Sequence, residues 1–145
     1  MSNVNEQLEM KGHLKIELNG EVVRDIDNLV VTAGKNFVAS RMIGTSAGVM
    51  THMAVGTGTT DPAAGDTALE TQVGSRKAFT TSASVSGAVV TYVCAFSAGE
   101  GTGALTEAGI FNASSSGTML CRTEFSVVNK GASDSMTITW TVTVS

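Results

Sequence analysis

The stretch DSMTITWTVTVS, residues 134–145, decides the fold class of this chain. From Met136 to Val144 every second residue is apolar, and the residues between them are all threonines. This alternation predicts a β-strand that buries one face and exposes the other. A shift of one residue would turn all the apolar side chains outward, so we expect the register of this strand to be firmly set.

The same alternation occurs near the start of the chain, in MKGHLKIEL at residues 10–18. Asn19-Gly20 follows and favours a type I′ hairpin turn, because both central residues of that turn need a positive φ. The return strand is predicted to begin at Glu21 and to end at about Val31. Similar runs separated by Gly, Ser and Asn predict further strands at residues 50–55, 75–85, 87–99, 104–113 and 118–128.

One short helix is predicted at residues 33–43, where apolar residues recur at helical spacing. Thr32 is the expected N-cap, and Gly44 is expected to end the helix. A glycine-rich loop begins at residue 56. Within it, the sequence TALE at residues 67–70 fits a capping box and predicts a single helical turn.

About eight strands in 145 residues indicate one all-β domain, an antiparallel β-sandwich of which the jelly roll is one form. We expect the domain to span residues 10–145. Residues 1–9 are polar and lack periodicity, so we expect an extended N-terminal arm there.

Charged residues make up only 15% of the chain, and Thr, Ser and Gly replace them. A surface of hydroxyl groups is easier to desolvate than one of Lys and Glu, which favours a component of an assembly. The net charge of −4 without a basic cluster argues against nucleic-acid binding. The N-terminus resembles no signal peptide and no apolar run approaches a membrane span, so we expect a soluble protein made in a cytoplasm.

The sequence offers no pattern for a metal, a cofactor or a catalytic group. His13 and His52 are isolated, and turn or capping roles suit Asp61 and Asp66 better than calcium binding. We expect Cys94 and Cys121 to be buried thiols, with a disulfide between them left open.

A carboxylate pair for glycoside cleavage stays open on sequence grounds, but sugar clefts also carry several aromatic residues, and only 5% of this chain is aromatic. We therefore expect no enzyme. The carboxylates that could form such a pair are Asp25, Asp27, Glu107 and Glu124.

Two sets of residues are candidates for structural or binding roles. Arg76 and Glu107 could form an ion pair that locks the loop region onto the sheet, the alternative being two unrelated surface charges. In the N-terminal arm, Val4, Leu8 and Met10 could anchor the chain on a neighbouring protein by adding a strand or filling a groove.

Several motifs, taken in order, resemble small structural proteins of tailed bacteriophages. They are MAVGTGTT, then DTALETQV with Arg76, then LTEAGIFNASSSGTMLCRTEF and finally TITWTVTVS. The resemblance extends from about Val30 to the C-terminus. The order of Gly-x-Gly, a distant Leu and Arg, and Glu-x-Gly-Ile-Phe is also similar to the attachment domains of phage tail fibres.

The resemblance implies a virion component without enzymatic activity. A short acidic β-domain with no fibre shaft is typical of capsid decoration (cement) proteins, which bind the major capsid protein on the capsid surface and stabilise the shell. Such proteins often form dimers or trimers and are made in the bacterial host cytoplasm. A tail or tail-fibre attachment component, bound to tail proteins, is the alternative. A carbohydrate-binding module is the third, and it would need an exposed aromatic platform.

Overall fold

The computed structural model describes residues 7–44 and 47–145, and this part of the chain forms one antiparallel sheet and one short helix. The strand order is β4-β3-β7-β8-β2-β1-β9-β6-β5. The elements, in chain order, are β1 Met10–Leu18, β2 Glu21–Val30, α1 Thr32–Arg41, β3 His52–Gly56, β4 Lys77–Ala78, β5 Thr81–Ser86, β6 Val89–Phe96, β7 Gly103–Phe111, β8 Met119–Lys130 and β9 Met136–Val144.

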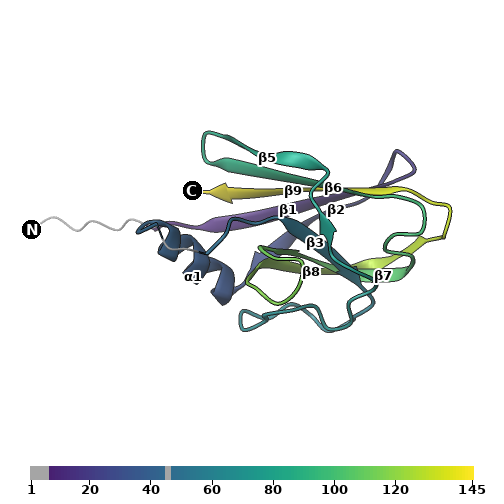
Figure 1. Ribbon diagram of the computed structural model, residues 1–145, viewed down its shortest axis with the longest axis horizontal. Helices are drawn as coiled ribbons and strands as arrows, with labels where there is room; N and C mark the ends of the chain where they lie inside the picture. Colours follow the sequence, from purple (N-terminus) through teal and green to yellow (C-terminus); the bar gives the residue numbers. More distant parts are fainter. Residues whose placement is uncertain (1–6, 45–46) are drawn as a thin grey trace, which may run out of the picture.

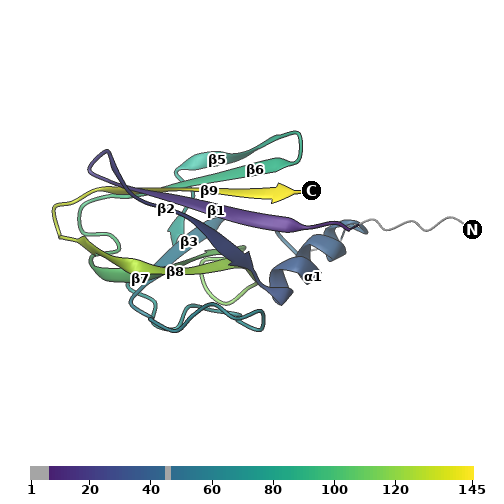
Figure 2. The same cartoon turned by 180° about the vertical axis from the view of Figure 1, so that it is seen from behind.

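The sheet curls so that its two halves face each other across the core, as the layers of a sandwich do (Figure 1). One layer holds β5, β6, β9 and β1, and the other holds β8, β7, β3 and β4. Strand β2 joins them, because it pairs with β1 and, through Leu29 and Val30, also with β8. Figure 2 shows β2 running from beside β1 toward the second layer, where it leads into α1. The predicted all-β, sandwich-like fold is confirmed.

The segment between β4 and β5 links the two layers at the opposite side of the sheet. The backbone N–H of Phe79 donates to the carbonyl oxygen of Thr51 beside β3, and that of Thr80 donates to the carbonyl oxygen of Val93 in β6. Chain neighbours β1 and β2 form a hairpin within one sheet. A jelly roll instead divides eight strands between two sheets as two Greek keys. The nine strands instead form one continuous curled sheet, which differs from the jelly roll that the prediction left open.

The pattern of β9 has the predicted effect on packing. Its four residues Met136, Ile138, Trp140 and Val142 are all buried, and the threonines between them lie on the outer face. The hairpin between β1 and β2 is also confirmed, since Asn19 and Gly20 have φ values of 51° and 83°.

The core is centred on Trp140, which is fully buried and whose indole Nε1–H donates to the side-chain oxygen of Asn28 over 2.7 Å. Gly12 makes room for this bond, because a Cβ at residue 12 would lie 2.0 Å from the same Asn28 oxygen. Cys94 and Cys121 are both buried free thiols, and burial raises the pKa of each to about 12.

Helix α1 packs on β8 through Gly34, where a Cβ would lie 2.3 Å from the carbonyl oxygen of Leu120. The N-cap is Val31 rather than the predicted Thr32, and no side chain caps the helix. The helix ends at Arg41 instead of residue 43, and Gly44, with φ of 66°, lies in the turn that follows. Within the described ranges no helix is both long and apolar enough to cross a membrane.

Candidate functional site

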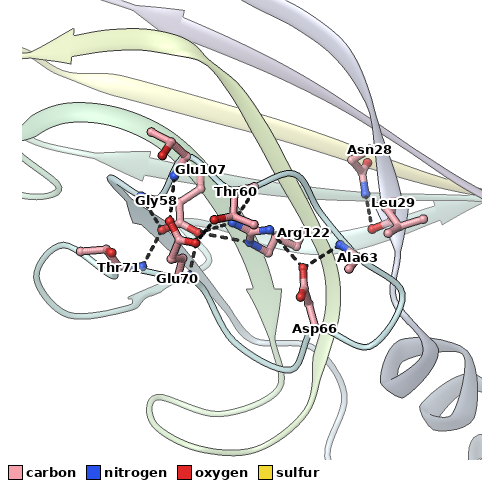
Figure 3. A network of polar contacts seen from close by, with 11 residues as sticks. Asn28, Leu29, Gly58, Thr60, Ala63, Asp66, Glu70, Thr71, Glu107 and Arg122 are labelled. Carbon is pink, nitrogen blue, oxygen red and sulfur yellow. Dashed lines mark hydrogen bonds and ion pairs between the residues drawn. The ribbon is translucent and has the colours of Figure 1, made fainter.

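The most connected polar group of the described chain lies beneath the loop between β3 and β4. The carboxylate of Glu107, on β7, has no exposed surface. It accepts backbone N–H bonds from Gly58 over 2.8 Å, from Glu70 over 2.9 Å and from Thr71 over 2.7 Å (Figure 3). One side chain therefore holds both the beginning and the end of the loop at residues 57–72.

Arg122, on β8, completes this group. Its guanidinium is only 2% exposed and donates to Glu107 through Nε over 3.2 Å and through Nη2 over 3.0 Å. The same guanidinium bonds the carboxylate of Asp66 and the carbonyl oxygen of Thr60, both over 3.0 Å. We call Glu107, Arg122 and Asp66 the loop anchor. A buried pair of this kind contributes to stability chiefly because loss of one partner leaves the other charge buried and uncompensated.

Two glycines allow the loop to approach Glu107 closely. A Cβ on Gly56 would lie 2.6 Å from the Oε2 atom of Glu107, and a Cβ on Gly58 would lie 2.4 Å from it. The Gly-x-Gly element of the sequence is thus explained by space for a carboxylate, and not by binding of a phosphate.

The predicted ion pair between Arg76 and Glu107 is wrong, because each of these residues has a different partner. Arg76 instead lies over the ring of Phe111, 3.6 Å from its centroid, and donates to the carbonyl oxygens of Ala113 and Ser116. It therefore fastens the loop before β4 to the turn between β7 and β8. Glu107 does hold the loop to the sheet, as expected, but its cationic partner is Arg122.

The predicted helical turn at residues 67–70 is also wrong. Residues 67–70 form no helix, and the carboxylate of Glu70 accepts bonds from the N–H of Thr59 and the hydroxyl of Thr60 across the loop. These bonds lower the pKa of Glu70, the hydroxyl of Thr60 being the larger cause. Asp66 has the predicted turn role, since it accepts the N–H of Ala63.

The buried polar atoms of the loop anchor are all bonded within the protein. Among residues 7–44 and 47–145, every buried side-chain nitrogen or oxygen has a hydrogen-bond partner, and no cluster of His, Cys, Asp and Glu suits a metal ion. Of the four carboxylates weighed for sugar chemistry, Glu107 lies opposite Glu124 in register, whereas Asp25 and Asp27 lie on β2. The geometry of the loop anchor is that of a structural group that holds the loop at residues 57–72 to the sheet.

Asp25 and Asp27 flank His13 on the exposed side of the β1–β2 hairpin. The Nδ1 atom of His13 lies 2.8 Å from the carboxylate of Asp27, and its Nε2 atom contacts Asp25. The hydrogen bond to Asp27, and secondly that to Asp25, raise the pKa of His13 above 6.5.

We predict that Asp27→Asn lowers the pKa of His13, measured by NMR titration of its imidazole protons. Because the folded-state pKa is raised, the stabilisation from His13 is complete below pH 6.5 and is lost as the pH rises through the folded-state pKa. The variant should therefore lose stability at acidic pH and little at alkaline pH. Glu17→Gln, on the same strand as His13, is the control. An unchanged His13 titration in Asp27→Asn would contradict the assignment.

A second candidate site is the outer face of the layer formed by β5, β6 and β9. Cross-strand register places Thr91 opposite Thr141, Val93 opposite Thr139 and Ser84 opposite Thr91. We call this the hydroxyl face, and its side chains are Ser84, Ser86, Val89, Thr91, Val93, Ala95, Thr137, Thr139, Thr141 and Thr143. None of these side chains carries a charge.

The three N-terminal residues proposed as anchors differ in whether they are described and in how far they are exposed. Val4 lies outside the described residues. Leu8 is 79% exposed, whereas Met10 is half-buried at the start of β1 and packs against the core. Of the two described residues, Leu8 is the one whose side chain is available to a partner.

Comparison with known proteins adds no family to these observations. The chain matches no protein-family model, and no curated protein or solved structure matches it significantly.

Proposed function

We propose that this protein is a capsid decoration protein of a tailed bacteriophage, which binds the major capsid protein and stabilises the shell without catalysing a reaction. The hydroxyl face carries the proposal. Its Thr, Ser, Val and Ala side chains are uncharged and short, so a partner protein can cover them at a small cost in desolvation and side-chain entropy.

The placement of this face supports the same function. The outer face of the other layer is covered, because the loop at residues 57–72 lies over β7 and β8 and packs Leu69 against Phe111 and Met119. The hydroxyl face has no such cover among the described residues, and its residues are half-buried or exposed. A broad, regular surface of this kind suits contact with a shell better than capture of a small molecule.

The alternative is a tail or tail-fibre attachment component. One observation favours it: the elements of the tail-fibre resemblance converge in space, with Gly56 and Gly58 against Glu107 and Leu69 beside Gly109. Copy number separates the two functions. A decoration protein should be present in purified particles at a number comparable to that of the major capsid protein, and a tail component at a small fraction of it.

A carbohydrate-binding module is the less favoured class. All seven aromatic residues are either buried or packed against the core, so they form no exposed platform for sugar rings. They are Phe37, Phe79, Tyr92, Phe96, Phe111, Phe125 and Trp140.

We predict that Thr91→Glu on the hydroxyl face weakens binding to shells of the encoding phage at least about tenfold, because the interface would bury an unpaired charge. Ser126→Glu, on an exposed position of β8, is the matched control, since it adds the same charge elsewhere. Binding is measured by co-sedimentation with shells stripped of the protein. Equal binding by both variants would contradict the role of the hydroxyl face, and absence of the protein from purified virions would contradict the function itself.

A further inference from the structure

The two edge strands of the sheet differ in how far they are protected from pairing with another chain. Strand β4 is only two residues long and carries Lys77, and both features discourage the addition of a further strand. Strand β5 has six residues, all of them exposed, and none of them is charged or a proline. In Figure 1 its hairpin with β6 forms the side of the molecule away from β7 and β8. One edge of the sheet is therefore protected and the other is open.

The hydrogen bonds of the neighbouring strands show which backbone groups of β5 point outward. The N–H of Val144 in β9 donates to the carbonyl oxygen of Ala88, just before β6. Backbone groups alternate in direction along an antiparallel strand, so Val90 also directs its N–H and carbonyl toward β9. Val85 lies opposite Val90. The N–H and carbonyl of Val85 therefore point away from β6, at the open edge of the sheet.

The side chains of β5 determine which kind of strand fits beside it. Ser84 and Ser86 belong to the hydroxyl face, whereas Val85 lies on the opposite face and is 69% exposed. An added strand would have hydroxyl groups beside it on one face and an apolar side chain on the other. Strand β5 offers no charge to pair with a charged residue. The complementary segment is thus extended and uncharged, with small polar and apolar residues in alternation.

We propose that such an extended segment of the major capsid protein adds to the edge of β5 as a further strand. This inference rests on the proposed function and deepens it, because it names the part of the partner that binds. Backbone bonds to Val85 hold the segment, and its side chains set the register. A short strand alone falls below the roughly 800 Å² per partner of a standard interface. The hydroxyl face, which begins at Ser84 and Ser86, supplies further contact area beside it.

A register shift between Thr81 and Ser84 limits the length of the open edge. Irregularities of this kind disfavour pairing beside them. The pairing of β5 with β6 is regular from Ser84 to Ser86 and leads directly into the turn at Gly87. We therefore expect the added segment to be short and to have Val85 as its central partner.

The gap between β2 and β8 is the rival site for strand addition. These strands pair only through Leu29 and Val30 of β2, and they separate beyond this point (Figure 2). Arg24 crosses the gap and donates to the carbonyl oxygens of Ser126 and Val127. A strand that entered the gap would have to displace this guanidinium. Since no described residue occupies the edge of β5 in this way, β5 is the better candidate.

The test is co-sedimentation of Val85→Pro with shells stripped of the protein. Proline removes the outward N–H of residue 85 and is tolerated on an edge strand where that group faces solvent. The dissociation constant should rise at least about tenfold. Val85→Thr is the matched control, because it keeps both the N–H and a β-branched side chain, and it should bind as the wild type does. Hydrogen exchange of the Ser86 amide, which points toward β6, shows whether β5 remains paired in both variants.

Hydrogen exchange of the wild type gives a second measurement that needs no variant. The amide of Val85 should exchange at least about tenfold more slowly on the shell than in the free protein, because the added strand accepts its N–H. An unchanged rate would overturn strand addition, as would equal binding by Val85→Pro and Val85→Thr, and either result would leave the capsid function standing. Failure of the wild type to bind shells would instead overturn the capsid function, and this inference with it.

Discussion

Glu107→Gln is expected to lower the free energy of unfolding by roughly 3–5 kcal/mol, a large share of the 5–15 kcal/mol typical of a domain. The substitution keeps the size of the side chain but removes its charge, which leaves the buried guanidinium of Arg122 with only Asp66 as a counter-charge. The amide of the glutamine also has an NH₂ group in place of one carboxylate oxygen, so it cannot accept all the N–H bonds that the loop backbone donates to Glu107. Urea unfolding followed by fluorescence of Trp140, the single tryptophan, measures the loss.

Glu124→Gln is the control for this prediction. Glu124 lies on β8 opposite Glu107 in register, so the variant makes the same chemical change, but its side chain is only half-buried. It should cost less than about 1 kcal/mol. Hydrogen exchange gives a local readout, since the amides of Gly58 and Thr71 should exchange faster in Glu107→Gln. Equal stability of the two variants would show that the loop anchor does not hold the loop.

The sequence indicated that Glu107 was unusual but not which cation it meets. Arg76 was the expected partner because it opens a predicted strand after the loop. Arg122 becomes the partner because β7 and β8 form a hairpin in which Gly109 lies opposite Arg122, so Arg122 is a diagonal neighbour of Glu107 on the same face. Aligning the two predicted strands across the intervening SSSG sequence would have suggested this pair.

Short sequence motifs predicted the structure correctly where the conformation is determined by the residues of the motif itself. Asn19-Gly20 forms the predicted turn because the requirement for positive φ lies within those two residues. The prediction of a capping box at residues 67–70 was wrong because Glu70 bonds Thr59 and Thr60. These two residues lie outside the four-residue motif on which the prediction was based. The long loop is held by partners on β7 and β8, so its conformation follows from the strand pairing and not from its own sequence.

The loop anchor also bears on which surface is free to bind. It fixes the loop over the outer face of β7 and β8, where Phe111 and Met119 are fully or almost fully buried. Without this cover that face would expose apolar residues on the side of the molecule opposite the hydroxyl face. The anchored loop therefore distinguishes two sides of the molecule, one that the loop covers and one that carries the uncovered hydroxyl face beside the charged outer residues of β1. A defined orientation on a shell needs such a difference.

Trp140→Ala is expected to destabilise the protein by about 3–5 kcal/mol, because it removes the largest buried side chain and leaves the side-chain oxygen of Asn28 without its donor. Thr141→Ala, one residue along the same strand, should change stability by less than about 1 kcal/mol, since Thr141 lies on the outer face. Chemical denaturation followed by far-UV circular dichroism suits both variants, because it does not need the tryptophan. The contrast between adjacent residues tests the register directly: similar losses at both positions would mean that β9 does not bury one face alone, and the sandwich inferred from residues 134–145 would then be wrong.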